Sequence, residues 1–119
     1  MQGHSSSVSA VVDFYGVSSL PDMRPGGVSM GGSADPDLLA AASPLGYVTA
    51  GAAPFLLIHG DSDGLVPLSQ SELLAAALTE AGVRNELIAV EGGDHCFFFA
   101  EDRVDGILRT AVDYFAREL

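Results

Sequence analysis

The sequence predicts an α/β fold in which three layers, α/β/α, are built on a parallel sheet of about three strands. Three short runs place apolar residues on consecutive positions, as strands covered on both faces require. One helical pattern separates the second run from the third, and another follows the third. Strands that alternate with helices are typical of a parallel sheet. The 119 residues are enough for one domain, 1–119.

The predicted strands are rich in β-branched, aromatic and leucine side chains. The first covers residues 8–15, the second 55–58 and the third 86–90. The second strand consists of four consecutive large apolar residues, so both of its faces should be buried. Glycines follow the first and third strands and mark their ends.

Two helices are predicted. Ser69 and Glu72 have the spacing of a capping box at the start of the first, and Gly82 supplies a left-handed stop at its end. The second should cover a sheet face with one apolar stripe, because its apolar residues recur at intervals of three and four: Val104, Ile107, Leu108, Ala111, Val112 and Phe115.

Residues 17–53 read as a long, lid-like loop rich in Gly, Ser, Pro and Ala. Within it, 37–42 could form a short helix with Asp35 as its cap and Pro36 in its first turn. A connection of this length is usually functional or loosely ordered.

Charge and composition exclude several classes of function. Five basic residues against sixteen acidic ones give a net charge of −11, which disfavours nucleic acid and anionic membrane surfaces as partners. No apolar run approaches the roughly 20 residues that span a bilayer. The polar amino terminus has no secretory pattern and favours the cytoplasm, although an export signal further upstream would change this. The single cysteine, Cys96, excludes an intrachain disulfide and a multi-cysteine zinc site.

Asp63 and His95 follow the second and third strands and are the candidate catalytic residues. The carboxyl ends of parallel strands meet at one edge of the sheet, so we expect the two side chains to lie in contact. A carboxylate that holds an imidazole is the general-base half of a nucleophilic triad. Alternatively, Asp63 is a plain turn carboxylate and His95 a satisfied strand-end histidine. Asp61 is expected to be a local turn acceptor.

A metal site at this edge would have to use Asp61, Asp63, Asp94 and His95. The loop lacks the alternating oxygen ligands of a calcium site, and histidines at helical spacing are missing. We therefore expect no metal ion and no cofactor.

These residues resemble the α/β-hydrolase family, in particular its carboxylesterase and prolyl-oligopeptidase-like members. The resemblance lies in residues 11–16, 42–45, 55–67 and 92–98, and it covers only the carboxyl-terminal half of that fold. It implies a partial α/β-hydrolase fold, an ester-hydrolysing activity, and a catalytic triad in which Asp63 orients His95. The expected substrate is a small-molecule ester.

The nucleophile is less clearly marked. The pentapeptide Gly27-Val28-Ser29-Met30-Gly31 fits the Gly-x-Ser-x-Gly pattern of a nucleophile elbow. No apolar strand leads into it, and Pro36 prevents a long helix after it. Ser29 is therefore a candidate nucleophile, whereas the usual elbow is expected to be missing from this chain. The alternative function is an inactive hydrolase fragment that folds by self-association.

Two further expectations concern the neighbours of these residues. Cys96 should be a buried, inert small residue, and Phe97, Phe98 and Phe99 should line an apolar pocket or pack under the last helix. The strand at 8–15 should expose an unpaired edge, because the strand that carries the elbow would be its neighbour. Such edges recruit another chain, so a homodimer or other association through 8–15 is expected.

Overall fold

The computed structural model describes residues 8–20, 23, 36–97 and 100–119. Its strands are β1 (Val11–Phe14), β2 (Phe55–Gly60) and β3 (Asn85–Val90), and its α-helices are α1 (Pro36–Ala41), α2 (Ser69–Glu80) and α3 (Val104–Glu118). Short 3-10 helices with both ends in the described ranges are η2 (Pro44–Tyr47), η3 (His95–Phe97) and η4 (Glu101–Arg103). No helix in these ranges has the length and apolar character needed to cross a membrane.

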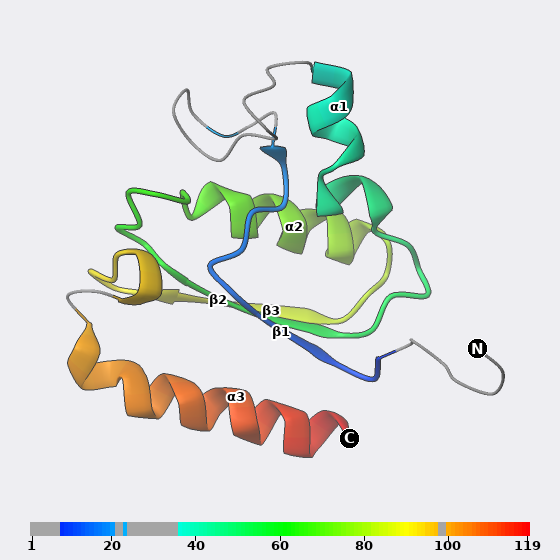
Figure 1. The fold of residues 1–119 in the computed structure, drawn as a ribbon. Coiled ribbons are helices and arrows are strands. Elements are labelled where there is room, and N and C mark those ends of the chain that lie inside the picture. Colours follow the sequence, from blue (N-terminus) through cyan, green and yellow to red (C-terminus); the bar gives the residue numbers. More distant parts are fainter. Residues whose placement is uncertain (1–7, 21–22, 24–35, 98–99) are drawn as a thin grey trace, which may run out of the picture.

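The three strands form one parallel sheet in the order β1-β2-β3. Helix α2 lies over one face of the sheet and α3 over the other (Figure 1). The predicted three-layer α/β/α arrangement is therefore confirmed, and the carboxyl ends of all three strands lie at one edge. The register, which pairs Phe14 with Ile58 and Gly60 with Val90, brings the turns after β2 and β3 side by side.

The central strand β2 divides the core into two clusters, because alternate side chains of a strand point to opposite faces. Leu56 and Ile58 pack with Tyr114 of α3, whereas Leu57 packs with Leu74 and Leu78 of α2. The side chains of Leu56, Leu57 and Ile58 are essentially inaccessible to solvent. Each contributes roughly 1.5–3 kcal/mol on burial, so β2 is the most firmly held strand.

Helix α2 ends as predicted but begins differently. Gly82 has a φ of 80°, and the amide of Val83 donates to the Leu78 carbonyl at 2.8 Å, which closes the helix with a left-handed residue. The predicted capping box is wrong: Leu68 precedes the helix and already has helical dihedral angles. The amides of Gln70, Ser71 and Glu72 donate to the carbonyls of Pro67 and Leu68, so Ser69 lies inside the first turn and has no capping role.

Strand β1 is shorter than the predicted 8–15. It ends at Phe14 because Tyr15 adopts a φ of 45°, which takes the backbone out of the extended conformation. Within the described residues β1 pairs only with β2, and its other edge has no partner strand. The amides of Val11 and Tyr15 donate toward β2, so the period of two directs the backbone groups of Val12 and Phe14 to the open edge.

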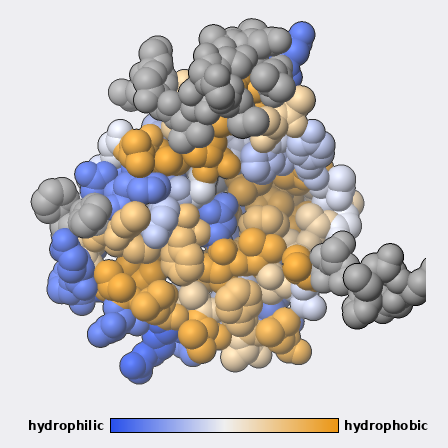
Figure 2. Space-filling view, in the orientation of Figure 1, coloured by the Kyte–Doolittle hydropathy of each residue, from blue (hydrophilic) through white to orange (hydrophobic). Residues whose placement is uncertain are grey.

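Helix α3 turns only part of its predicted stripe toward the sheet. Ala111 and Tyr114 are buried, whereas Leu108, Val112 and Phe115 are 51%, 65% and 37% exposed. The exposed residues form a second stripe one position further along, rotated by about 100° around the helix. Figure 2 shows hydrophobic residues gathered over β1 and the adjoining side of α3.

The described parts of 17–53 are tied to helix α2 and to one another. The amide of Ser18 donates to Gln70 Oε1 at 2.9 Å. The amide of Leu20 donates to Ser43 Oγ at 2.7 Å, and the amide of Leu45 donates to the Ser18 carbonyl at 2.8 Å. Helix α1 spans Pro36–Ala41 rather than the expected 37–42, and the expected cap Asp35 lies outside the described residues.

Candidate active site

Asp63 lies in the turn after β2 and is held by that turn. Its Oδ1 accepts hydrogen bonds from the amides of Leu65 at 2.9 Å and Val66 at 2.8 Å. The side chain is inaccessible to solvent. These bonds fix the carboxylate plane and leave Oδ2 to face the next turn.

His95 comes from the turn after β3 and meets that oxygen. Its Nδ1 lies 2.9 Å from Asp63 Oδ2, so the predicted contact is present. An ionised carboxylate only accepts hydrogen bonds, so Nδ1 carries the proton and Nε2 of the neutral ring keeps a lone pair. Nε2 makes no hydrogen bond to any described residue, and the His95 side chain is 26% exposed. The geometry leaves an oriented base accessible from outside.

Two reciprocal hydrogen bonds join the turns that carry this pair. Asp61 Oδ1 accepts from the Gly92 amide at 2.8 Å, and Asp94 Oδ1 accepts from the Gly64 amide at 2.8 Å. The bonds from the amides of Gly64 and His95 lower the pKa of Asp94. Asp61 is thus an acceptor for the neighbouring turn as well as for Ser62. The ties fix the separation between the two strand ends.

Gly60 allows the turns to approach each other. A Cβ on Gly60 would overlap the carbonyl oxygen of Gly93, so this position tolerates only glycine at the present separation.

Tyr15 forms an aromatic wall beside His95 and was not predicted as a site residue. Its ring centroid lies 4.6 Å from that of His95 and 5.0 Å from that of Phe97. Burial raises the pKa of Tyr15, and a hydrogen bond with Cys96 raises it further. Tyr15, Cys96 and Phe97 all have positive φ angles although none is glycine. Such strain is costly and tends to collect at functional sites.

The expected burial of Cys96 is wrong, whereas the expected packing of Phe97 under the last helix is confirmed. Cys96 is exposed rather than buried, since η3 places it in a left-handed conformation (φ 57°) at the surface. Phe97 is buried and packs with Tyr114 of α3, as expected. Phe98 and Phe99 lie outside the described residues.

His59 is a second imidazole at this site that the sequence reasoning missed. It lies at the end of β2, and its Nε2 is 3.4 Å from Asp63 Oδ2. The sequence does contain a sign of it, because His59 directly follows the apolar run 55–58. A titratable side chain that continues a buried strand needs hydrogen-bond partners in the core.

The structure brings together Asp63 and His95 but gives no position for the candidate nucleophile, because Ser29 lies outside the described residues. Among the residues it does place, no group of His, Cys, Asp or Glu side chains is arranged to hold a metal ion. Asp61 and Asp94 are instead engaged with backbone amides.

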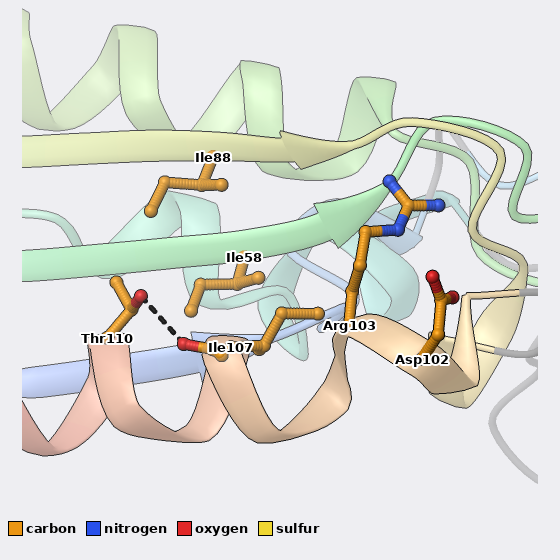
Figure 3. A pocket seen from close by; sticks show the side chains of 7 residues that line it. Ile58, Ile88, Asp102, Arg103, Ile107 and Thr110 are labelled. Atoms are coloured by element: carbon orange, nitrogen blue, oxygen red, sulfur yellow. Dashed lines mark hydrogen bonds between the residues drawn. The ribbon is translucent and has the colours of Figure 1, made fainter.

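A cavity of about 460 Å³ lies apart from the pair, between the sheet and the start of α3 (Figure 3). Ile58, Ile88 and Ile107 provide apolar walls, and Asp102 and Arg103 stand at one end. Neither Asp63 nor His95 lines this cavity, so the candidate active site is the strand-end edge rather than this space.

The fold is a parallel sheet between two helical layers, and an aspartate and a histidine are hydrogen-bonded at the carboxyl edge of the sheet. This arrangement defines part of an α/β-hydrolase. The chain belongs to the BD-FAE family, whose profile matches residues 1–78. That match includes β1, β2 and Asp63. The chain is therefore a member of an esterase-type hydrolase family and contains part of the family fold.

Known proteins agree with this membership. Esterase LipQ of Mycobacterium tuberculosis (strain ATCC 25618 / H37Rv) is 37% identical over 82 residues, which are 68% of this chain and 20% of LipQ. An acetyl ester-xyloside bifunctional hydrolase from Caldicellulosiruptor lactoaceticus superposes with a TM-score of 0.77 at 27% identity, covering 92% of this chain and 42% of that one. The propionate-bound esterase Est2 of Thermogutta terrifontis superposes with a TM-score of 0.74 at 26% identity, covering 98% and 45%. The chain thus spans less than half of the length of these relatives.

Proposed function

We propose that this chain supplies the acid–base pair of a serine-dependent esterase, with Asp63 orienting His95. The observation that carries the proposal is the 2.9 Å hydrogen bond between His95 Nδ1 and Asp63 Oδ2. The partial exposure of the His95 side chain and the membership in an esterase-type family support it. In this role Asp63 stays ionised and stabilises the imidazolium that forms during proton transfer.

The reaction is acyl transfer through a covalent acyl-serine. The serine Oγ attacks the ester carbonyl carbon while its proton moves to His95 Nε2. The bond between the carbonyl carbon and the alkoxy oxygen then breaks, and His95 returns the proton to the leaving alcohol. A water molecule attacks the acyl-serine in the same way, which releases the carboxylic acid and regenerates the serine.

Two sources of the serine are consistent with the sequence. Ser29 lies in a Gly-x-Ser-x-Gly pentapeptide that precedes Asp63 and His95 in the chain. Alternatively, the usual nucleophile elbow is missing from this chain, and the serine belongs to polypeptide outside it. We propose a small-molecule ester with a short acyl group as substrate, because the relatives include an acetyl ester hydrolase and a propionate-bound esterase.

A serine-directed fluorophosphonate probe tests this proposal. The purified chain should gain one covalent adduct, and peptide mapping should place it on Ser29 if this chain contains the nucleophile. Ser29→Ala should abolish labelling and the hydrolysis of p-nitrophenyl acetate, whereas Ser33→Ala in the same segment should leave both unchanged. Because a lone imidazole also cleaves this ester slowly, His4→Gln is the matched control for His95→Gln. A folded chain with neither adduct nor turnover would contradict Ser29 as the nucleophile.

The alternative function is a hydrolase fragment without activity that folds by self-association, with a second copy of this chain as its partner. The open edge of β1 favours it, since the backbone groups of Val12 and Phe14 are directed outward. The exposed stripe of Leu108, Val112 and Phe115 adds apolar surface to the same side of the molecule. The net charge of −11 argues against nucleic acid or an anionic membrane in place of the second copy.

A further inference from the structure

His59 is a histidine without solvent contact that the proposed reaction does not use. It is fully buried on β2, one position beyond Ile58, and faces the α2 side of the sheet. Its Nδ1 lies 2.7 Å from Ser71 Oγ, and its Nε2 lies 2.7 Å from the carbonyl oxygen of Val66. Both ring nitrogens therefore have a partner.

These partners determine where the ring proton sits. A backbone carbonyl can only accept, so Nε2 must carry the hydrogen that it donates to Val66. Nδ1 of the neutral ring is then an acceptor, and the Ser71 hydroxyl donates to it. Nε2 also lies 3.4 Å from Asp63 Oδ2, so the Nε2–H group faces that oxygen at a distance too long for a good hydrogen bond.

Val66 links this histidine to the catalytic carboxylate. Its carbonyl accepts from His59, while its amide donates to Asp63 Oδ1 at 2.8 Å. His59 thus fixes the Val66 carbonyl, and the amide of the same residue fixes the Asp63 carboxylate. Removal of the Nε2 donor would leave the Val66 carbonyl unpaired and release the turn.

We propose that His59 is a positioning residue that keeps Asp63 Oδ2 directed at His95 Nδ1, using the Val66 backbone and its own Nε2–H. The catalytic part of this inference rests on the proposed function, but the positioning part does not. In a merely structural role, loss of His59 would lower stability and leave the His95–Asp63 hydrogen bond intact.

Two substitutions of His59 by residues with an amide side chain distinguish the positioning role from a merely structural role. His59→Gln reaches as far as Nε2 and can still donate to Val66, whereas His59→Asn reaches only as far as Nδ1 and keeps the contact with Ser71. Long-range ¹H–¹⁵N spectra of the 119-residue chain in mildly alkaline buffer report which nitrogen of each histidine carries the proton. The wild type should show Nε2–H for His59 and Nδ1–H for His95.

The expected result is that His59→Gln keeps the Nδ1–H form of His95, whereas His59→Asn shifts His95 to a mixture of tautomers. If the chain hydrolyses p-nitrophenyl acetate, kcat should fall at least tenfold in His59→Asn and less than threefold in His59→Gln, with KM within about twofold in both. Equal His95 spectra in two folded variants would overturn the inference, as would an Nδ1–H form of His59. The spectra decide this even if the wild type has no activity, a result that would contradict only an active esterase within this chain.

Discussion

His95 Nδ1 lies 2.9 Å from Asp63 Oδ2, although 32 residues and a complete helix separate them in the chain. The contact exists because β2 and β3 are parallel neighbours and the turns after them are tied by Asp61 and Asp94. The close approach of Gly60 to Gly93 leaves little freedom in this separation.

The approach at Gly60 predicts a contrast between two glycines. Gly60→Ala should destabilise the fold by several kcal/mol or rearrange both turns, because the new methyl group overlaps backbone. Gly106→Ala in α3 should stabilise it by about 0.5–1 kcal/mol, since its Cβ meets nothing within 4 Å and alanine is the better helix former. Urea unfolding of both variants measures the difference. Equal stability of the two would show that the turns are not closely packed.

The strained turn at Cys96 predicts a stabilising substitution. Cys96 has a φ of 57°, a conformation that costs an L-residue about 1–2 kcal/mol and glycine little. Cys96→Gly should therefore raise the free energy of unfolding by about 0.5–1 kcal/mol, even though glycine gains entropy in the unfolded chain. Cys96→Ala is the control, because it removes the thiol and keeps the Cβ. If alanine stabilises as much as glycine, strain is not the cause.

A half-buried acid on β1, Asp13, predicts a pH dependence of stability. Burial raises the pKa of Asp13 above 3.8, and the amide of Gly16, which donates to Oδ1 at 3.0 Å, opposes that shift only in part. The folded state therefore binds the proton more tightly than the unfolded state, so this group costs stability as pH rises through the window above 3.8.

Asp13→Asn should accordingly raise the urea midpoint at pH 7, and the gain should shrink as pH approaches 4. Asparagine retains an oxygen that can accept from Gly16. The check is a pair of urea titrations at the two pH values, with Asp37→Asn, a surface acid on α1, as control. A gain that grows on acidification would contradict the assignment.

The open edge predicts self-association that a single charge can weaken. Val112 lies in the middle of the exposed stripe of α3, so Val112→Lys should convert a dimer into a monomer and raise its dissociation constant at least tenfold. Thr110→Lys introduces the same charge on the same helix away from the stripe and should leave the dimer intact. Light scattering over a dilution series measures both. A wild type that is monomeric and folded at all concentrations would rule out the second copy as partner.

Much of the fold follows from local sequence patterns. The four large residues of β2, the glycine after α2 and the order of strands and helices predict the parallel sheet and the edge where Asp63 and His95 meet. The same patterns do not predict the ends of elements that are set by contacts with other parts of the chain. Pro67 and Leu68 supply the carbonyls that satisfy the first turn of α2, so Ser69 is not a cap. Tyr15 ends β1 early through a positive φ that nothing in its side chain predicts.

The apolar stripe of α3 shows a further limit. Periodicity indicates which residues share a helix face, but only packing decides which of two overlapping stripes meets the sheet. His59 is missed because the role of a buried histidine depends on partners that the chain brings from Val66 and Ser71.

The hydrolysis of p-nitrophenyl acetate by Asp63→Asn and by Asp61→Asn tests the central claim most directly. At position 63 the amide cannot hold His95 in the correct tautomer, so kcat/KM should fall about 10²–10⁴-fold. At position 61 the amide oxygen can still accept from Gly92, and activity should stay within about twofold of the wild type. Equal rates for the wild type and Asp63→Asn would contradict the pairing of Asp63 with His95 as the catalytic base. A folded wild type that hydrolyses nothing would contradict Ser29 as the nucleophile of an active esterase within this chain.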